Sequence, residues 1–437
     1  MIQKNPLIDI VCAQKSGMPK GIYSVCSSNA FVIEACIEEE KDSANFVLVE
    51  STSNQVNQYG GYTGMNPAKF IKFVYKIAAK VGFPERRILI GGDHLGPNVW
   101  QNEPAQIAME KSCVLVSDAV KAGYSKIHLD ASMKCADDDP NKALDIWTSA
   151  RRAAEMCQAA EEVYLKEPVS EWKPCYIIGT EVPVPGGTLL GETDLCITRP
   201  EVAQQTIEVT RASFYKLGLH EAWERVVGLV VQPGVEFGDS SLNIYNRELA
   251  IGISKFIEGY ENIIYEAHST DYQPREVLRH MVEDHFTILK VGPALTFAFR
   301  EAVFALEMME QEWLHGRKDV VLSHLQKTLD NSMLENPKYW RNYYQGDETY
   351  LRYARKFSYS DRSRYYWPNE EIQKSLKILL SNLSKHPVPE SLLSQFMPYQ
   401  YQKVVRKELD NNPISLISDR IKFQISDYLY ACNGSYL

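Results

Sequence analysis

The sequence predicts an α/β protein built around a (β/α)8 TIM barrel, with a mainly helical extension at its C-terminus. Within residues 1–313, eight short apolar runs alternate with segments of helical periodicity. Such alternation indicates a parallel sheet, and eight units favour a closed barrel over an open sheet of about five or six strands. A barrel needs about 250 residues. The 437-residue chain therefore has room for a further region.

The predicted strands are short runs, rich in Val, Ile, Leu and Tyr, that are apolar at most positions. This pattern is typical of strands covered on both faces, as in a barrel surrounded by helices. In chain order they span residues 21–25, 46–49, 88–90, 126–129, 176–178, 226–231, 263–267 and 288–291.

Each predicted strand is followed by a helix, and several of these helices have recognisable ends. Ser27 or Ser28 can cap the first helix, Pro67 suits the first position of the second, and Gly123 can end the third. The first helix runs to about residue 41, and the others span residues 67–81, 104–122, 143–160, 201–217, 248–258, 275–284 and 297–313.

Residues 314–437 differ from the rest, being rich in Tyr, Arg, Ser and Asn. Helices are predicted over residues 319–329 and 369–383, and residues 356–368 are dense in aromatic and cationic side chains. We therefore predict two regions, a barrel over residues 1–313 and a helical extension over residues 314–437 that packs on it.

Composition excludes several classes of protein. The net charge of −9 and the lack of a long Lys/Arg cluster argue against nucleic-acid binding. No apolar run reaches the roughly 18 residues of a membrane span, and residues 1–17 lack the layout of a signal peptide. The nine scattered cysteines are typical of reduced thiols. We expect a cytoplasmic protein with no nucleic-acid or membrane partner.

Three candidate ligands for a divalent metal ion lie at the ends of predicted strands: His94, His268 and Glu181. Two imidazoles and a carboxylate suit Zn²⁺, Mn²⁺ or similar ions and leave a position open for substrate oxygens. Asp93 could act as acid or base on a metal-bound substrate, and Glu181 could be the base instead of a ligand. The structural alternative is that Asp93 caps a turn while His94 is a buried, hydrogen-bonded histidine.

Further polar residues near strand ends could contact a sugar. His128 and Asp130 are two residues apart and share one strand face, so Asp130 could bind a hydroxyl or orient His128; an inward polar layer is the alternative. Gln232 and Glu236 could also contact a polyol. Glu266 precedes His268 by two residues and so shares its strand face. It could orient the His268 ring without contacting the ligand itself.

Phosphate recognition is expected near the last strand. Residues 290–296 leave that strand and enter a helix, and loops after strands seven and eight often bind phosphate in barrels. Lys290, Ser269 and Thr270 could take part. Arg362 and Arg364 could add cationic contacts from the extension, although a surface ion-pair cluster is the alternative for them.

Seven motifs closely resemble those of the Z-subunit (GatZ/KbaZ) family of class II tagatose-bisphosphate aldolases. The similarity extends from about residue 20 to beyond residue 400. The motifs are residues 54–64 (NQVNQYGGYTG), 91–98 (GGDHLGPN), 179–187 (GTEVPVPGG), 231–237 (VQPGVEF), 266–272 (EAHSTDY), 290–296 (KVGPALT) and 358–368 (SYSDRSRYYWP).

The resemblance implies a barrel related to the catalytic class II aldolases, which hold zinc with three histidines beside an aspartate. Asp93-His94 matches that aspartate–histidine pair, and His268 matches the histidine of strand seven. Where the catalytic subunits carry a histidine after a Gly-Thr pair, this chain has Glu181 and Val182. One ligand is therefore changed.

Two functions are implied by the resemblance. One is a 4-epimerase that interconverts D-tagatose 6-phosphate and D-fructose 6-phosphate by retro-aldol and aldol steps, with a divalent metal (Zn, Mn, Ni or Mg). The alternative is a non-catalytic subunit that supports the activity and stability of the catalytic aldolase subunit. The expected partners are a phosphorylated ketohexose, that catalytic subunit and a second copy of the chain in a homo-oligomer.

Overall fold

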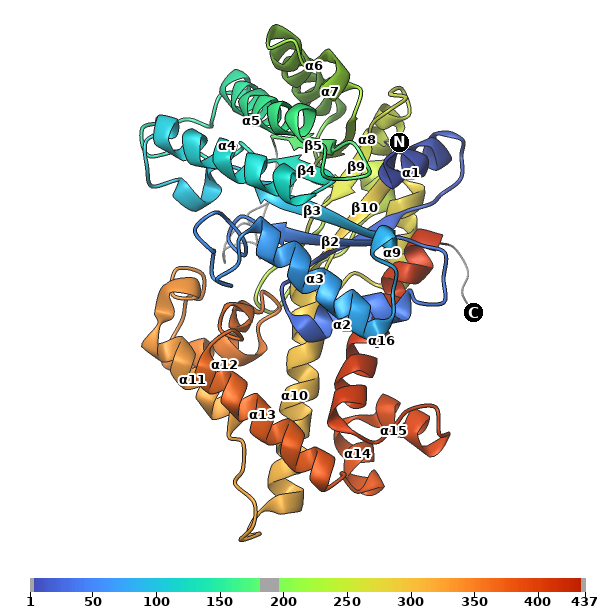
Figure 1. The fold of residues 1–437 in the computed structure, drawn as a ribbon, viewed down its shortest axis with the longest axis vertical. Coiled ribbons are helices and arrows are strands. Elements are labelled where there is room, and N and C mark those ends of the chain that lie inside the picture. The colour runs from blue at the N-terminus through green and yellow to red at the C-terminus, as the bar shows by residue number, and fades with distance from the viewer. Residues whose placement is uncertain (1–3, 181–195, 434–437) are drawn as a thin grey trace.

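The computed structural model describes residues 4–180 and 196–433, and it consists of a barrel with a helical lobe beside it (Figure 1). Eight parallel strands close the barrel in the order β1-β10-β9-β6-β5-β4-β3-β2. The strands are β1 (Ile22–Cys26), β2 (Val47–Thr52), β3 (Ile88–Leu95), β4 (Lys126–Leu129), β5 (Cys175–Gly179), β6 (Val226–Val230), β9 (Ile264–Ala267) and β10 (Phe286–Val291). The predicted (β/α)8 barrel is confirmed, and each predicted strand overlaps an observed one.

Helices surround the barrel because each strand presents apolar side chains outward as well as inward. The helices of the repeating units are α2 (Ala30–Glu39), α3 (Pro67–Val81), α4 (Ala105–Ala122), α5 (Ile146–Lys166), α6 (Pro200–Lys216), α8 (Arg247–Ile257), α9 (Arg275–Glu283) and α10 (Pro293–Leu314). All eight correspond to predicted helices. A short α7 (His220–Trp223) and a small hairpin, β7 (Glu236–Phe237) with β8 (Leu242–Asn243), were not predicted.

Helix α1 (Pro6–Lys15) covers one end of the barrel and closes it. This helix was not predicted from the sequence. Its Leu7, Ile10 and Val11 pack against inward-facing residues of the strands, including Leu89. Asn5 caps this helix and also donates from Nδ2 to the carbonyl oxygens of Ser125 and Lys173, at 2.9 and 3.0 Å. Apolar packing thus fills this end, so the polar residues of the interior gather at the opposite end.

The extension is helical, as predicted. It comprises α11 (Leu325–Glu335), α12 (Glu348–Phe357), α13 (Glu370–Lys385), α14 (Glu390–Phe396), α15 (Pro398–Val405) and α16 (Pro413–Asn433). Helix α10 runs from the barrel into this lobe, and α16 returns to pack against α2, α9 and α10 (Figure 1). Because α10 belongs to both parts, a domain boundary at residues 313/314 remains a prediction.

One predicted helix of the extension is displaced. The sequence predicts a helix over residues 319–329, whereas α11 begins at Leu325. The carboxylate of Glu310 accepts hydrogen bonds from the backbone and hydroxyl of Ser323, and His324 adopts a left-handed conformation (φ 49°). These contacts hold the preceding residues outside the helix.

A buried ion pair joins the two parts close to the barrel mouth. Arg300 of α10 contacts Asp361 of the extension at 2.8 Å, and Thr296 of α10 donates to the same carboxylate at 2.6 Å. The extension therefore holds residues 362–365, the 3₁₀ helix η4 (Arg362–Tyr365), over the open end of the barrel.

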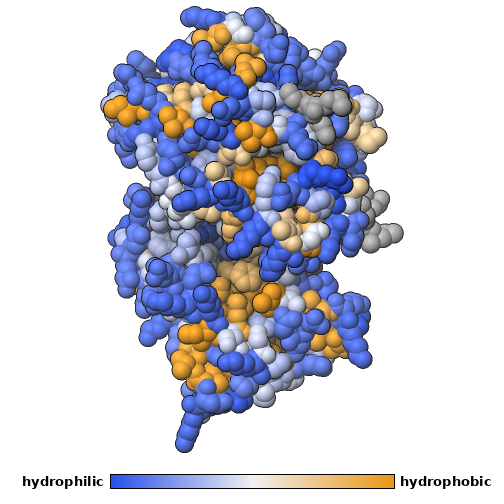
Figure 2. Space-filling model, in the orientation of Figure 1, coloured by the Kyte–Doolittle hydropathy of each residue, from blue (hydrophilic) through white to orange (hydrophobic). Residues whose placement is uncertain are grey.

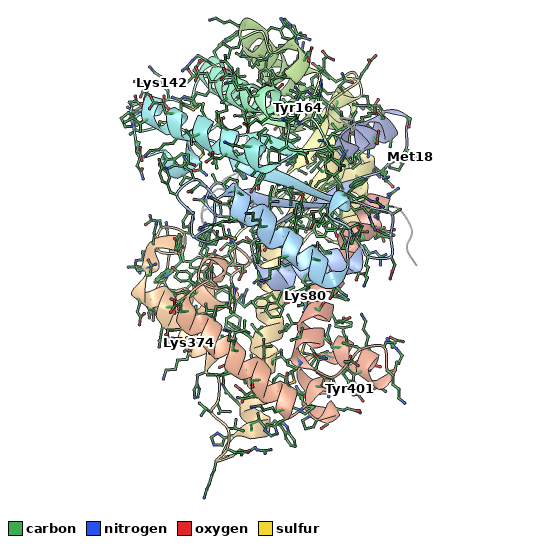
Figure 3. All side chains as sticks on the ribbon, in the orientation of Figure 1. Met18, Lys80, Lys142, Tyr164, Lys374 and Tyr401 are labelled. Atoms are coloured by element: carbon green, nitrogen blue, oxygen red, sulfur yellow. The ribbon has the colours of Figure 1, made fainter. Side chains whose placement is uncertain are left out.

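The face of the molecule seen in Figure 2 is mainly hydrophilic and carries several apolar patches, one of them near its middle. Side chains fill both lobes in Figure 3, where Lys80 lies on α3 of the barrel and Lys374 on α13 of the extension. Among the described residues, no helix is both long and apolar enough to cross a membrane.

Candidate functional site

A layer of buried charged residues lies inside the barrel above the apolar core. Lys126 of β4 is fully buried, and its Nζ is 2.6 Å from Glu50 Oε1 of β2 and 2.6 Å from Glu266 Oε2 of β9. Glycine at position 91 makes room for this layer, since a Cβ there would lie 2.8 Å from Glu50 Cγ. Burying unpaired ions costs several kcal/mol each, so these groups must be balanced where they lie.

Lys290 of β10 extends this layer toward the open end. Its ammonium group contacts Glu50 and lies 3.2 Å from Asp93 Oδ1. Burial lowers the pKa of Lys290, but Asp93, Cys26 and Glu50 outweigh it and hold the pKa well above its ordinary value. Lys290 is therefore an ammonium ion at neutral pH and is not poised to attack a carbonyl as a free amine.

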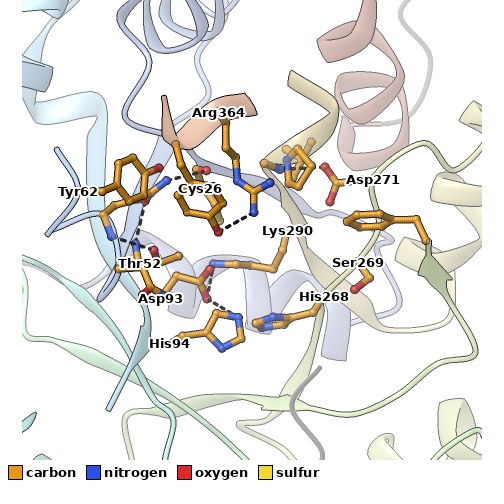
Figure 4. Close-up of a pocket in the computed structure, with 17 residues that line it drawn as sticks. Cys26, Thr52, Tyr62, Asp93, His94, His268, Ser269, Asp271, Lys290 and Arg364 are labelled. Atoms are coloured by element: carbon orange, nitrogen blue, oxygen red, sulfur yellow. Dashed lines mark hydrogen bonds and ion pairs between the residues drawn. The ribbon is translucent and has the colours of Figure 1, made fainter. Parts of the chain in front are cut away.

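Three histidines meet at the mouth of the barrel. The ring centroids of His94, His128 and His268 are 4.7–5.2 Å apart. His94 Nδ1 lies 2.8 Å from Asp130 Oδ2, and His268 Nε2 lies 3.0 Å from Glu266 Oε1. Figure 4 shows the His94 and His268 rings next to each other at the base of a pocket.

The position of His94 depends on an irregular end of β3. The pairing of β3 with β4 shifts register between Gly92 and Leu95, and His94 has a φ of 47°. Glycine is required at position 96, because a Cβ there would lie 1.7 Å from the carbonyl oxygen of Asp130. This close approach of β3 and β4 brings His94 against Asp130. Strain of this kind is often found at ligand sites.

The carboxylates of the site are held in their ionised form. Burial alone would raise the pKa of Asp93, but His94 and Lys290 keep it well below its ordinary value. The pKa of Glu266 is likewise held low, against burial, by Lys126 and Lys290. Burial would also raise the pKa of Asp130, but its hydrogen bond to His94 lowers it.

The pKa values of the two histidines next to the pocket are shifted in opposite directions. Burial lowers the pKa of His268 to about 4, so this ring is neutral at pH 7. Burial also lowers the pKa of His94, but Asp93 and Asp130 outweigh it and raise the pKa overall. The two carboxylates thus favour a positive charge at His94, whether that charge is a proton or a bound cation.

Several of these residues could hold a metal ion. Ligand atoms of Asp93, His128, Glu266 and His268 all lie within 4.8 Å of one another, and all four residues are buried. This set shares His268 with the predicted ligands but contains His128 in place of His94. The hydrogen bonds decide between the two histidines.

His128 Nδ1 accepts a hydrogen bond from the His94 backbone N–H at 3.2 Å, and in this tautomer the hydrogen is on Nε2 and no lone pair is left for a metal. The other tautomer, with Nδ1 donating to Asp93 at 3.4 Å, would free Nε2. A neutral His94 that donates from Nδ1 to Asp130 has a lone pair on Nε2. A neutral His268 that donates from Nε2 to Glu266 has one on Nδ1. A carboxylate behind each ligating histidine is the usual arrangement in metal sites. We therefore favour His94 and His268 as the imidazole ligands.

The charge of the cluster also suits a divalent cation. With neutral histidines, four carboxylates face two ammonium groups, which leaves two negative charges in a buried space. The carboxylates are Glu50, Asp93, Asp130 and Glu266, and the ammonium groups belong to Lys126 and Lys290. Imidazole and carboxylate donors are common to Zn²⁺ and Mn²⁺ sites.

The pocket above the cluster encloses about 640 Å³, part of it open to solvent. Both the barrel and the extension contribute to it, because Arg364 and Tyr365 of η4 line it together with strand-end residues (Figure 4). Of the predicted site residues, those that line this pocket are Asp93, His94, His268, Ser269, Lys290 and Arg364.

Three other predicted site residues, Asp130, Gln232 and Arg362, are not among the described residues that line it. Asp130 lies behind His94 and orients that ring. The sequence alone suggests a hydroxyl contact or an orienting role toward His128 instead. The side-chain oxygen of Gln232 accepts from the backbone N–H groups of Gly234 and Val235, so it stabilises a turn. Glu181 lies outside the described residues.

The two arginines of the extension differ from each other. Arg362 is buried, donates to the carbonyl of Tyr339 at 3.0 Å and stacks on the ring of Tyr343. Among the described residues neither Arg362 nor Arg364 pairs with a carboxylate. The alternative of a surface ion-pair cluster is therefore wrong for both.

The helix start expected to bind phosphate is already occupied. Asp271 Oδ1 accepts hydrogen bonds from the N–H groups of Gly292 and Ala294, at 3.0 and 2.8 Å. The first turn of α10 thus carries an internal carboxylate where a phosphate was predicted.

Sequence reasoning missed Glu50 and Lys126. A signal was present, since Lys126, His128 and Asp130 alternate along one strand and all three are polar. In a strand with helix-covered outer faces, such a row has to point into the barrel and requires counter-charges there.

Comparison with known proteins identifies the family. The family model for D-tagatose-1,6-bisphosphate aldolase subunit GatZ/KbaZ-like proteins matches residues 7–433. This chain belongs to that family. It is 49% identical over 426 residues to a Klebsiella pneumoniae protein named D-tagatose-1,6-bisphosphate aldolase subunit GatZ, covering 98% of this chain and 99% of the relative. A Salmonella enteritidis protein of the same name is 47% identical over 424 residues, covering 97% and 98%.

A solved structure is also similar over nearly the whole chain. It is titled a probable tagatose 6 phosphate kinase from Sinorhizobium meliloti, and it matches with a TM-score of 0.85 and 41% identity. The match covers 94% of this chain and 100% of that one. The barrel and its extension are therefore shared by this GatZ/KbaZ-like chain and that protein.

The Asp271 carboxylate predicts an unusual dependence of stability on pH. Burial raises its pKa to about 6, above the ordinary value of 3.8. Between these values the folded state keeps a proton that the unfolded state has lost, so stability falls as pH rises and the loss is complete above pH 6. Asp271→Asn keeps the Oδ1 acceptor but cannot ionise. Its stability advantage over the native chain should grow by about 2 kcal/mol between pH 4 and pH 7.

Urea unfolding at several pH values measures this difference. Asp139→Asn is the control, because a hydrogen bond from the Asn141 backbone lowers the pKa of this exposed carboxylate, so any change should have the opposite sign. A constant difference between Asp271→Asn and the native chain from pH 4 to 7 would contradict the prediction.

Proposed function

We propose that this chain is the Z-type subunit of a tagatose-bisphosphate aldolase, acting with a separate catalytic subunit in tagatose breakdown. The observation that carries the proposal is its 47–49% identity, over nearly the full length of both chains, to proteins named as GatZ subunits of that aldolase. The comparisons favour this role over the epimerase. We do not extend the kinase title of the Sinorhizobium structure to this chain, because the sequence has no glycine-rich nucleotide loop.

The test is co-expression with the catalytic subunit of a class II tagatose-bisphosphate aldolase. The two chains should co-purify, and aldolase activity and its half-life on heating should each rise several-fold over the catalytic subunit alone. Asp93→Asn should support the partner as well as the native chain does if support comes from the surface. Equal activity and half-life with and without this chain would refute the role.

The second candidate is a 4-epimerase that interconverts tagatose 6-phosphate and fructose 6-phosphate. A specific observation favours it: a supporting subunit has no need for ionised Asp93, paired histidines and Lys290 around an open pocket. Such a concentration of buried, perturbed ionisable groups is more typical of an active site.

The ligand atoms that lie within 4.8 Å of one another belong to Asp93, His128, Glu266 and His268, a donor set that suits a divalent cation. The hydrogen bonds of the histidines, and not this distance, are the reason to prefer His94 over His128. We propose that His94 and His268 would hold the cation, with Glu181 or Asp93 as the carboxylate ligand. When bound, the ion would supply Lewis-acid polarisation of the ketose carbonyl.

Asp93 is ionised and can accept a proton, so it would take the proton of the C4 hydroxyl. Glu181, predicted from sequence, is the other candidate for this base. The C3–C4 bond then breaks, its electron pair passes to the C2 carbonyl, and C4 becomes the aldehyde of glyceraldehyde 3-phosphate. The Lys290 ammonium would offset the negative charge of the three-carbon enediolate. Rotation of the aldehyde and bond closure on its other face, with return of the proton, gives the C4 epimer.

Assay of the purified chain alone tests this candidate. With Mn²⁺, Ni²⁺ or Zn²⁺ it should convert fructose 6-phosphate to tagatose 6-phosphate, and EDTA should abolish the activity. Loss of a general base typically costs 10²–10⁴-fold, so Asp93→Asn should fall by at least about 100-fold. Asp410→Asn, at an exposed aspartate of the extension, is the control and should be fully active. No conversion with any of the three metals would rule the epimerase out.

A further inference from the structure

We propose that Arg364, supplied by the extension, binds the single phosphate of a ketohexose monophosphate at the mouth of the barrel. The inference rests on the proposed role in tagatose metabolism, since it presumes a phosphorylated ketose as ligand. In this proposal the phosphate is bound by a residue of the extension. Many barrels instead bind phosphate in the loops after strands seven and eight.

Arg364 is positioned to bind an anion. Its Nη1 donates to the backbone carbonyls of Ser360 and Asp361, which fixes the guanidinium in direction without neutralising it. Within the described ranges 4–180 and 196–433, no carboxylate forms an ion pair with it. Most other arginines of the protein's interior, such as Arg152, Arg225 and Arg300, do pair with a carboxylate. The carboxylates of Asp361 and Asp271 act on Arg364 only at longer range than an ion pair. A held guanidinium that faces a pocket and forms no ion pair with a described carboxylate suits a phosphate.

Hydroxyl groups beside Arg364 add donors. Arg364 Nη2 donates to the Tyr365 hydroxyl at 3.0 Å, so that oxygen accepts and its own hydrogen is available for a ligand. Arg364 and Arg362 lower the pKa of Tyr365 despite its burial, which makes the hydroxyl a stronger donor. Ser269 lines the same pocket in a left-handed conformation, with a φ of 55°.

The start of α10 is excluded as the phosphate site. Its N–H groups at Gly292 and Ala294 already bind the Asp271 carboxylate. A phosphate there would have to displace an internal acceptor and would face its negative charge. Arg364 is therefore the group that we expect to bind the phosphate in place of the α10 N–H groups.

The charges around the pocket match one phosphate. Lys290 and Arg364 are the lysine and arginine side chains among the described lining residues, and Lys290 is already paired with Glu50 and Asp93. The segments outside the described residues, 1–3, 181–195 and 434–437, contain no Lys or Arg. A second phosphate would therefore find no cation, so we expect a monophosphate and not a 1,6-bisphosphate.

The position of Arg364 also indicates which end of the sugar carries the phosphate. Figure 4 shows Arg364 on the side of the pocket opposite His94 and His268, with Lys290 between them. A ketose whose carbonyl faces the histidines would direct its far end, C6, toward Arg364.

Isothermal titration of the full chain with D-fructose, D-fructose 6-phosphate, D-fructose 1,6-bisphosphate and inorganic phosphate tests the proposal. The 6-phosphate should bind at least tenfold more tightly than fructose, the bisphosphate should gain less than threefold more, and inorganic phosphate should compete. Arg364→Gln should remove the advantage of the 6-phosphate over fructose while leaving fructose binding unchanged.

Two further variants keep the test decisive. Arg352→Gln, at an exposed arginine of α12, removes the same charge and should bind like the native chain. Tyr365→Phe removes only a hydroxyl and should weaken the 6-phosphate several-fold, which covers the case that Arg364→Gln fails to fold. If the native chain prefers the 6-phosphate and both pocket variants keep that preference, the phosphate binds elsewhere and the inference fails alone. If the native chain binds no ketose phosphate, both the phosphorylated ketose as ligand and the role of Arg364 are wrong.

Discussion

The buried charges at the mouth of the barrel are the constraint on which the site depends. Glu50, Lys126 and Glu266 have no solvent contact, and each is held by an oppositely charged neighbour at the top of the apolar core. Removing one member of such a group leaves an uncompensated buried charge and typically costs about 3–5 kcal/mol. The layer therefore fixes the strand ends relative to one another before any ligand is considered.

This layer also determines the chemistry that is possible above it. Because Lys126 and Lys290 hold the pKa of Glu266 low, that carboxylate can orient His268 as an ionised acceptor. Lys290 in turn stays protonated and contributes a fixed positive charge. The pocket thus combines a polar base, suited to the carbonyl end of a sugar, with Arg364 of the extension, suited to its phosphate. The extension therefore contributes residues to the pocket, Arg364 and Tyr365.

The strands and most helices of the barrel were predictable because their signals are local. Apolar runs, Pro67 at a helix start and Gly123 at a helix end each act within a few residues. Helix α1 was missed because its role, sealing the barrel, depends on contacts with strands far along the chain. The start of α11 was misplaced because Glu310, on another helix, binds Ser323.

The polar residues at the strand ends indicated where the site lies. They did not indicate which of these residues are hydrogen-bond partners of one another. Asp130 was expected to bind a sugar hydroxyl or to orient His128, whereas the irregular end of β3 brings His94 to it. Asp271 could not be foreseen at the start of α10, because neither its sequence context nor that of Gly292 indicates their contact. Contacts of this kind form when the barrel closes. The sequence of a single segment therefore carries no signal for them.

The central proposal is that the cluster would hold one divalent cation between His94 and His268. Anomalous diffraction at the manganese edge, from crystals soaked in Mn²⁺, tests it directly. The account predicts a single strong peak next to His94 Nε2 and His268 Nδ1 that is lost in crystals of His94→Ala. Saturating Mn²⁺ without a peak in that position, or a peak that persists unchanged in His94→Ala, would contradict it.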